Sequence, residues 1–416
     1  MTLRAWLALL VALGACAMRP TKPPAPSAAR PFIITFWCGP PLAEFTDARA
    51  AEIADAGFSV VGPPCEGGRD RGDQLRALDV AARHGLRMWV IDDRVGKTAP
   101  AKPGWEAAAA AVVADYGTHP ALDGYFVTDE PSTKEFPAVA KVVDWLRQAD
   151  AAHLAYVNLF PGYVRSRTLG TDSYEDYLEQ FATTVRPQLL SYDYYPFLTD
   201  KDRHGFFRNL AAVRETAARH RIPFMYIAQA MPHGPYRDPT ESELAWQVFN
   251  AMAYGARGIS YFAYWTPPDE PASDLDARWN FRYGLVEHGT PTRHFFQVAR
   301  LNRVIRVVTQ QLEGFEFIAV VNDADESASS FPIGPIDGIE GGTLTVGLFG
   351  SPGGDLAALV VNRDYRYAAT VAVRLSPGAR APERFDPVTG RWKRENEFTF
   401  RLEPGSPQLL KWRARS

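Results

Sequence analysis

The feature that most limits the possible folds is a series of eight short apolar segments, each followed by a helix-like stretch. The segments are 32–37, 58–62, 87–91, 124–128, 154–159, 189–193, 224–229 and 258–264. Amphipathic patterns predict helices near 44–56, 71–84, 104–116, 133–148, 173–184, 203–220, 240–254 and 292–311. Apolar residues are continuous within each segment rather than alternating, which is typical of strands buried on both faces of a parallel sheet.

Eight strand–helix units, spaced by roughly thirty residues, predict an α/β fold of the (β/α)8 TIM barrel type, which typically takes about 250 residues. We expect this barrel over 32–312. The alternative is a doubly wound open sheet, which would need a glycine-rich phosphate turn after its first strand. The sequence at that point, Trp37-Cys38-Gly39-Pro40-Pro41, is not such a turn.

The pattern changes after residue 312. Short β-like runs are separated by Gly, Pro and Asp turns, and they cover 315–321, 344–349, 356–362, 368–375, 399–402 and 408–412. This arrangement predicts a small C-terminal antiparallel β-sandwich over 313–416. It contains no recognisable catalytic group of residues.

The N-terminus resembles a bacterial export signal. Arg4 precedes the apolar run 5–15, which is too short for a permanent membrane-spanning helix and predicts a signal peptide over 1–15. Leu13-Gly14-Ala15-Cys16 resembles a lipobox, so Cys16 would carry the lipid; the alternative is a chance cysteine after a simple export signal. A tether rich in Pro and Ala follows over 16–31. We expect an exported bacterial lipoprotein in the outer membrane or facing the periplasm, with the lipid as its membrane anchor.

The remaining cysteines bear on the redox environment of the protein, and its overall charge bears on the kinds of partner that it binds. Cys38 and Cys65 follow neighbouring predicted strands, and either a disulfide or two buried thiols fits the sequence. The net charge is -3 and hydrophobic residues make up 46% of the chain. With no basic excess and no Lys/Arg run, nucleic acid is not an expected partner.

The ends of the predicted strands collect acids, amides and aromatic residues. In a barrel the carboxyl ends of all strands lie on one face, so these residues become neighbours. They are Trp37, Asp129, Glu130, Asn158, Phe160, Tyr192, Asp193, Tyr195, Gln229, His233, Tyr264 and Trp265. Aromatic faces stack on the C–H faces of sugars while amides and acids bond the hydroxyls, so this set predicts a carbohydrate ligand.

Two adjacent carboxylates stand at the end of the fourth strand. Asp129 and Glu130 follow an apolar run and precede Pro131. At this place in a barrel, paired acids predict acid–base catalysis. The alternative is structural: Asp129 would cap the next helix, with Pro131 in its first turn.

Other reactions that TIM-barrel enzymes catalyse need residues that this chain does not have at the required places. A Schiff-base enzyme needs a lysine on a strand, and none of the eight predicted strands carries one. The histidines do not form a metal-binding pattern, and the loop after the eighth strand, Trp265-Thr266-Pro267-Pro268, is a poor phosphate loop. We therefore expect no metal and no cofactor, and hydrolysis of a glycosidic bond remains.

On these residues the chain resembles the bacterial (β/α)8 glycoside hydrolases, over roughly residues 32 to 312. In the clan that includes the family 42 β-galactosidases, a glutamate ending the fourth strand is the general acid, which the resemblance assigns to Glu130. The same clan uses a glutamate ending the seventh strand as nucleophile. Here that position is Gln229, so the resemblance does not supply a nucleophile.

A second resemblance is to chitinase-like and hexosaminidase-like barrels. Asp123-Gly124 precedes Glu130 as in the chitinases, and Tyr192-Asp193 matches their sixth strand, but Phe126 and Thr128 replace two intermediate aspartates. The hexosaminidases use an adjacent Asp-Glu pair, as in Asp129-Glu130, in which the aspartate orients the acetamido group of the substrate.

The resulting hypothesis is a glycosidase with Glu130 as general acid. Its second carboxylate is Asp193 in a two-acid scheme or Asp129 in an acetamido-assisted one. The alternative is a non-catalytic glycan-binding lipoprotein on a degenerate barrel, for which Gln229 is the main argument.

The loop 232–239, which carries His233, has two interpretations. It closes over a substrate, or it forms an ion-paired turn into a helix with a capping box at Thr240 and Glu243.

Overall fold

The computed structural model describes residues 30–269, 279–325, 327–387, 389–394 and 398–414. The predicted signal peptide, Cys16 and nearly all of the tether lie outside these residues, so export and lipidation stay predictions. Residues Phe32–Ser416 form one compact unit. In the part of the chain that is described, none of the helices is long and apolar enough to cross a membrane.

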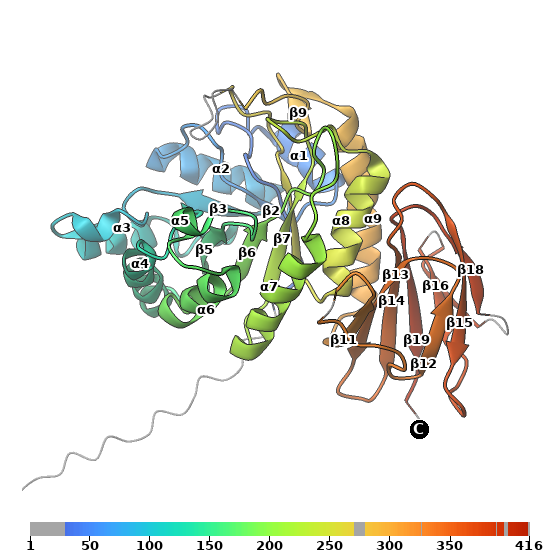
Figure 1. Ribbon diagram of the computed structural model, residues 1–416. Coiled ribbons are helices and arrows are strands. Elements are labelled where there is room, and N and C mark those ends of the chain that lie inside the picture. Colours follow the sequence, from blue (N-terminus) through green and yellow to red (C-terminus); the bar gives the residue numbers. More distant parts are fainter. Residues whose placement is uncertain (1–29, 270–278, 326, 388, 395–397, 415–416) are drawn as a thin grey trace, which may run out of the picture. The chain divides into compact units, whose positions relative to one another are not determined.

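Eight parallel strands form a single, nearly closed sheet with helices around it (Figure 1). The strands are β1 (Ile33–Ile34), β2 (Val60–Val61), β3 (Arg87–Ile91), β4 (Leu122–Asp129), β5 (Leu154–Leu159), β6 (Leu190–Asp193), β7 (Phe224–Gln229) and β8 (Gly258–Phe262). Their order is β1-β8-β7-β6-β5-β4-β3-β2. The predicted (β/α)8 barrel is confirmed, and the bounds of β3, β5 and β7 coincide with the predicted ones.

The expected helices follow the strands. They are α1 (Asp47–Asp55), α2 (Arg71–Arg83), α3 (Trp105–Tyr116), α4 (Phe136–Ala149), α6 (Tyr174–Thr184), α7 (Phe206–His220), α8 (Glu241–Ala253) and α9 (Arg293–Gln311). Side-chain caps define several starts, among them Asp70 before α2 and Ser173 before α6. The sequence did not predict the 3-10 turn η1 (Ala99–Ala101), α5 (Ser166–Leu169), or the β9 (Val286–Glu287) and β10 (Thr290–Pro291) hairpin, because such short elements show no periodicity.

The barrel closes where β1 meets β2. Ser59 joins the two strands: its backbone N–H donates to Ile34 O at 2.8 Å, and its hydroxyl oxygen accepts from Ile34 N at 3.0 Å. Beyond this point a disulfide links Cys38 to Cys65 with a Cα–Cα distance of 4.6 Å, which decides between the two alternatives left open above. The backbones lie so close that a Cβ on Gly62 would stand 2.0 Å from Phe36 O.

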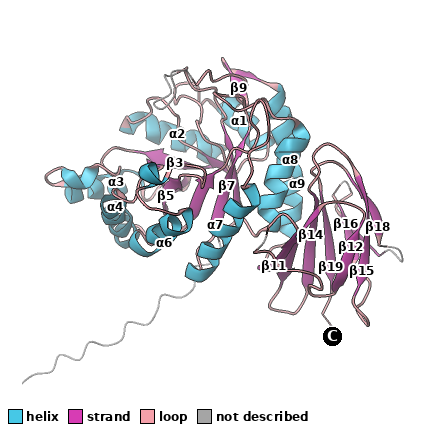
Figure 2. Ribbon diagram, in the orientation of Figure 1, coloured by secondary structure: helices cyan, strands magenta, loops and turns pink. Residues whose placement is uncertain are grey.

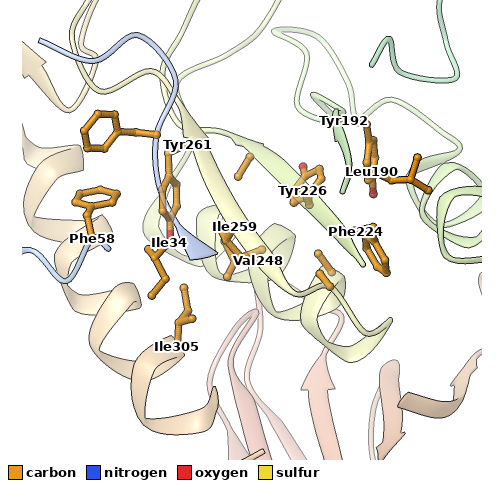
Figure 3. Packing of buried hydrophobic residues seen from close by; sticks show 14 of the residues in the cluster. Ile34, Phe58, Leu190, Tyr192, Phe224, Tyr226, Val248, Ile259, Tyr261 and Ile305 are labelled. Carbon is orange, nitrogen blue, oxygen red and sulfur yellow. The ribbon is translucent and has the colours of Figure 1, made fainter. Parts of the chain in front are cut away.

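Two apolar clusters occupy the two sides of the barrel sheet. Inside the barrel, side chains from different strands meet, including Trp89, Tyr156 and Met225. Outside, Ile34 and Ile259 pack toward the helices, near Val248 and Ile305 in the view of Figure 3. Burial on both faces explains the continuous apolar runs of the sequence.

The C-terminal segment forms two antiparallel sheets, magenta in Figure 2. One has the order β11-β13-β14-β19-β16-β17 and the other β12-β15-β18. Their bounds are β11 (Glu316–Asn322), β12 (Ile336–Glu340), β13 (Leu344–Gly350), β14 (Leu356–Asn362), β15 (Ala369–Leu375), β16 (Glu383–Asp386), β17 (Arg391–Arg394), β18 (Thr399–Leu402) and β19 (Pro407–Trp412). A shared cluster that includes Val346, Val360, Val371 and Phe400 joins them. This is the expected sandwich, with β12, β16 and β17 as additional strands that the sequence did not predict.

Helix α8 contacts both the barrel and the six-stranded sheet. It is buried on nearly every face, from Glu243 to Ala253. The indole N–H of Trp246 donates to Arg363 O at 2.7 Å, and the Tyr254 hydroxyl donates to Asp325 at 2.7 Å. The barrel and the sandwich therefore share a polar and apolar contact surface, and the predicted division at 312 into separate domains stays a prediction.

We predict that Gly62→Ala destabilises the protein, because the added Cβ would overlap Phe36 O at the seam, the place where the chain segments after β1 and β2 meet. The expected loss is about 1–3 kcal/mol in the free energy of unfolding, measured by urea denaturation. The matched control is Gly353→Ala, whose Cβ would meet nothing closer than Ser351 Oγ at 3.8 Å and should change stability by less than about 0.5 kcal/mol. Equal stabilities for the two variants would contradict this account of the seam.

Candidate active site

The end of β4 places two carboxyl side chains at the mouth of the barrel. Glu130 has a φ of 42°, in the left-handed region that costs a residue other than glycine about 1–3 kcal/mol. Its backbone N–H donates to Asn158 O at 2.9 Å, which holds this conformation against β5. Helix α4 begins only at Phe136, with Glu135 at its N-cap, so the alternative in which Asp129 caps that helix is wrong.

Asn158, at the end of β5, joins the acids of two other strands. Its amide N–H groups donate to Asp129 Oδ1 and to Asp193 Oδ1, both at 3.1 Å. Its carbonyl oxygen accepts from Ser191 Oγ at 3.0 Å, and Tyr156 in turn contacts Ser191 Oγ at 2.9 Å. This chain of bonds fixes the orientation of the amide, so both of its donors point at carboxylates.

The carboxyl groups of Glu130 and Asp193 lie close enough for each to change the pKa of the other. Burial, followed by the charges of Asp193 and Asp129, raises the pKa of Glu130 well above its usual range. Burial also raises the pKa of Asp193 to about 7, while the bonds from Asn158 and Glu130 oppose that rise. Glu130 is therefore the protonated donor and Asp193 the acceptor of the shared proton.

Asp129 differs from Asn158 and Asp193 because its side chain is exposed to water. It is the exposed residue at the end of β4, whereas Asn158 and Asp193 are buried. Yet protein surrounds it closely enough to raise its pKa to about 6, against the bond from Asn158 and the charge of Lys97. Asp129 is therefore accessible to a ligand at the mouth of the barrel, although protein surrounds it.

Aromatic side chains stand around these acids. The Trp37 ring packs edge-on against Phe126, with ring centroids 5.6 Å apart, and both rings are partly exposed. On the other side, Tyr195 contacts Phe262 at 5.6 Å and His233 at 5.2 Å. The charges of Asp193, Glu130 and Asp129 add to burial in raising the pKa of Tyr195, which places its ring beside the acids.

Three predicted substrate contacts do not face the mouth. Tyr192 points outward and packs on Tyr226 among Leu190 and Phe224 (Figure 3). It precedes Asp193 on one strand, and consecutive strand residues point to opposite faces, so the two cannot share the mouth. Tyr264 stacks on Phe36 outside the barrel, with ring centroids 4.3 Å apart.

Gln229 is the third correction. Its side chain is fully buried and exchanges two hydrogen bonds with the backbone of Phe197, both at 3.0 Å. Its Nε2 also donates to Arg237 O at 2.9 Å. The amide therefore ties together the loops after β6 and β7 and has no free group to offer a substrate.

The loop after β7 is an ion-paired turn. Arg237 contacts Glu243 at 2.5 Å and Asp202 at 2.8 Å, and the capping box of Thr240 and Glu243 is present. His233 is buried against aromatic rings, and burial lowers its pKa to about 4. This structure supports the ion-paired interpretation of the loop.

Trp265 lies in a separate cavity of about 410 Å³, beside the Cys38–Cys65 disulfide and Phe281. The lining of this cavity includes none of the three carboxyl residues. Phe160, the other aromatic residue predicted at the end of β5, packs near Tyr177 with ring centroids 6.4 Å apart.

Sequence reasoning missed Lys97, Tyr163 and Phe262. Lys97 and Tyr163 lie in the loops after β3 and β5. A search limited to the last residues of the predicted strands does not include loop residues. Phe262 is the last residue of β8, two residues before the predicted end of that strand. The apolar run continues past Phe262, so the sequence did not show where the strand ends. Across the described residues, no group of three or more His, Cys, Asp or Glu is arranged to hold a metal ion.

Comparison with solved structures relates this arrangement to known proteins. A family 42 β-galactosidase of G. stearothermophilus aligns with a TM-score of 0.59 at 10% identity, covering 92% of this chain and 98% of that one. A family 5 glycoside hydrolase of Bacteroides vulgatus aligns with a TM-score of 0.55 at 13% identity, covering 91% and 88%. The chain has the fold of the (β/α)8 glycoside hydrolases. The resemblance stated from the sequence is thereby confirmed for the fold.

A β-galactosidase of the psychrophilic Marinomonas ef1 aligns with a TM-score of 0.50 at 11% identity over 68% of this chain, which spans 60% of that protein. No protein-family model matches the sequence, and the comparison with curated proteins gave no match. At these identities the likeness extends to the fold, and the roles of individual residues rest on the geometry of the site.

We predict that Asp193 makes the protein less stable as the pH rises from about 4 to 7. Its pKa is 3.8 ordinarily and about 7 when folded, so over this range the folded state holds more protons than the unfolded state. Asp193→Asn should reduce that loss of stability by about 2–4 kcal/mol, measured by urea denaturation across pH. Asp172→Asn, at an exposed site, is the control and should follow the parent; an unchanged slope in Asp193→Asn would contradict the prediction.

Proposed function

We propose that the protein is a glycosidase that cleaves an oligo- or polysaccharide, with Glu130 as its general acid. The observation that carries the proposal is the interacting pair of Glu130 and Asp193 at the mouth of the barrel, in which Glu130 keeps the proton. A carboxyl group that stays protonated near neutral pH can donate to the departing glycosidic oxygen. The fold shared with glycoside hydrolases supports the same conclusion.

The arrangement assigns Asp193 to hold the proton of Glu130 rather than to attack the sugar. Asp193 raises the pKa of Glu130, and Glu130 opposes the rise in the pKa of Asp193, so the two carboxyl groups share a proton. Asp193 is also buried and bonded to Asn158, which leaves it little freedom to reach an anomeric carbon.

Asp129 is then the second carboxylate, in an acetamido-assisted scheme. It is exposed at the end of β4, and Asn158 orients it. It would hold the N–H of a 2-acetamido group while the acetamido oxygen attacks the anomeric carbon and Glu130 gives its proton to the leaving oxygen. Water then opens the oxazoline, and the Glu130 carboxylate takes the proton back. The substrate of this scheme is an N-acetylated glycan.

The non-catalytic alternative loses its main argument. Gln229 was its evidence for a lost nucleophile, but the Gln229 amide has a structural task at the base of two loops. In the acetamido-assisted scheme the nucleophile belongs to the substrate, so a glutamate at this position is not required.

We predict that Glu130→Gln lowers product release from the active glycan by about 10²–10⁴-fold, because glutamine keeps the shape of the side chain and cannot give a proton. The measurement compares both proteins on a panel of polysaccharides and N-acetylated oligosaccharides. Glu106→Gln, on the exposed first turn of α3, is the control and should match the parent. Equal release by Glu130→Gln and the parent would remove Glu130 from the mechanism, and retained glycan binding with no turnover by the parent would favour a binding protein.

We predict different kinetic effects for the two aspartates. Asp129→Asn should lower kcat on N-acetylated substrates at least about tenfold, because it weakens the hold on the acetamido group. Asp193→Asn should shift the loss of activity at high pH to lower pH, because the charge of Asp193 helps to raise the pKa of Glu130. Profiles of kcat against pH separate the two effects, and a loss of kcat in Asp193→Asn with an unshifted profile would contradict the assignment.

A further inference from the structure

A second cavity, of about 250 Å³, opens between the loops after β5 and β6. Its walls include Tyr163, Tyr174, Glu175, Gly205, Arg208 and Asn209. These residues come from the loop after β5 and from the first turns of α6 and α7, so the cavity lies at the N-terminal ends of two helices.

The cavity lies near Asp193 and Glu130. The Tyr163 hydroxyl accepts from the Tyr236 hydroxyl at 3.2 Å, and the charge of Asp193 adds to burial in raising the pKa of Tyr163. For Tyr174, which forms another wall, the charges of Asp193 and Glu130 likewise add to burial in raising the pKa. A sugar bound over Glu130 therefore has this cavity at its side.

Two buried polar groups line the cavity without a hydrogen-bond partner among the described residues. They are Asn209 Nδ2 and the Tyr174 hydroxyl, in side chains that are 4% and 8% exposed. The Asn209 amide lies close enough to the Tyr174 hydroxyl to lower its pKa, but no hydrogen bond joins these two groups. The other end of the amide is occupied, since Asn209 Oδ1 accepts from Gly162 N at 2.5 Å. The free end of Asn209 is therefore a buried donor that lacks an acceptor, which is unfavourable.

The start of α7 adds further donors. The helix follows Gly205, which has a φ of 96°, and no described side chain caps it, so the N–H groups of its first turn have no side-chain acceptor. Arg208 Nη2 lies over this turn, 3.7 Å from where a Cβ on Gly205 would stand. Within the described ranges, the guanidinium of Arg208 has no ion pair.

The balance of groups favours an acceptor with negative charge. Asn209 Nδ2, Arg208 and the first-turn N–H groups can only donate. The Arg203 guanidinium stacks on the Tyr163 ring at 3.9 Å and adds a second positive charge nearby. Glu175 also lines the cavity and opposes an anion, but it is exposed to water on the first turn of α6. A helix N-terminus with donors and an arginine is a site for an oxyanion.

We infer that this cavity is a subsite for an acidic substituent of the glycan, a carboxylate or a sulfate ester on a sugar next to the bond that is cleaved. The inference rests on the proposed glycosidase function and names its substrate class: an acidic, N-acetylated glycan. Binding an anion here also favours the protonated form of Glu130, because a nearby negative charge disfavours a second one.

The test is isothermal titration calorimetry with D-glucuronate, D-glucose 6-sulfate, D-glucose and inorganic sulfate. Asn209→Asp keeps an oxygen for Gly162 N and replaces the free donor by a negative charge, and Arg208→Gln removes the cation. We expect the parent to bind at least one acidic sugar at least about tenfold more tightly than glucose, and each variant to lose at least about tenfold. Arg219→Gln, on the last turn of the same helix, is the matched control and should bind as the parent does.

The outcomes separate the sources of the anion. Preference for glucuronate or for the sulfate ester identifies the substituent. Equal affinity for glucose, parent-like binding by Asn209→Asp, or binding of inorganic sulfate with neither acidic sugar bound would overturn the subsite. Binding requires no turnover, so the result is readable in Glu130→Gln as well, and selective binding by a protein that releases no product would keep the subsite and remove the glycosidase.

Discussion

Closure of the parallel sheet is the constraint on which the rest of the structure depends. Every strand of such a barrel delivers its last residue to the same face, so acids from β4 and β6 and the amide from β5 meet although they are separated by about thirty residues each. On one side, β1 joins the sheet through the short pairing of Ile33 and Ile34 with Gly258 and Ile259. At the opposite side of β1, Ser59 and the Cys38–Cys65 disulfide hold β2, next to Trp37 at the mouth.

Bringing three carboxyl groups into one enclosed place has an electrostatic cost, and the site resolves it by keeping protons. Ionised carboxylates lose hydration when protein surrounds them, and like charges repel, so the pKa values of Asp129, Glu130 and Asp193 all rise. Asn158 limits the rise for the two aspartates by donating to both. The three groups therefore differ in protonation near neutral pH, and this difference is what acid catalysis requires.

A set of hydrogen-bond donors lies at the start of α7, near the carboxyl groups of Glu130 and Asp193. The mouth is rich in acceptors and the neighbouring cavity in donors, so a ligand that spans both needs hydroxyl or amide donors at one end and an anion at the other. An acidic glycan has this distribution of groups. The aromatic rings of Trp37 and Tyr195 provide apolar faces between polar contacts.

The sequence by itself determined the barrel, the sandwich and the strand ends that carry Asp129, Glu130, Asn158 and Asp193. It did so because apolar runs, caps and turn residues act locally and recur at each unit. Only the tertiary structure decided which strand-end residues face the mouth. Tyr192 turned out to point outward because side chains alternate along β6, and Gln229 was enclosed by two loops that close over it.

The pairing of Glu130 with Asp193 and the cavity at Asn209 likewise belong to the tertiary structure. Both depend on distances between strands and loops far apart in the chain, and those distances are set by how the barrel packs. The sequence shows which side chains have reactive groups. Burial and proximity determine which of these groups are protonated and which remain without a hydrogen-bond partner.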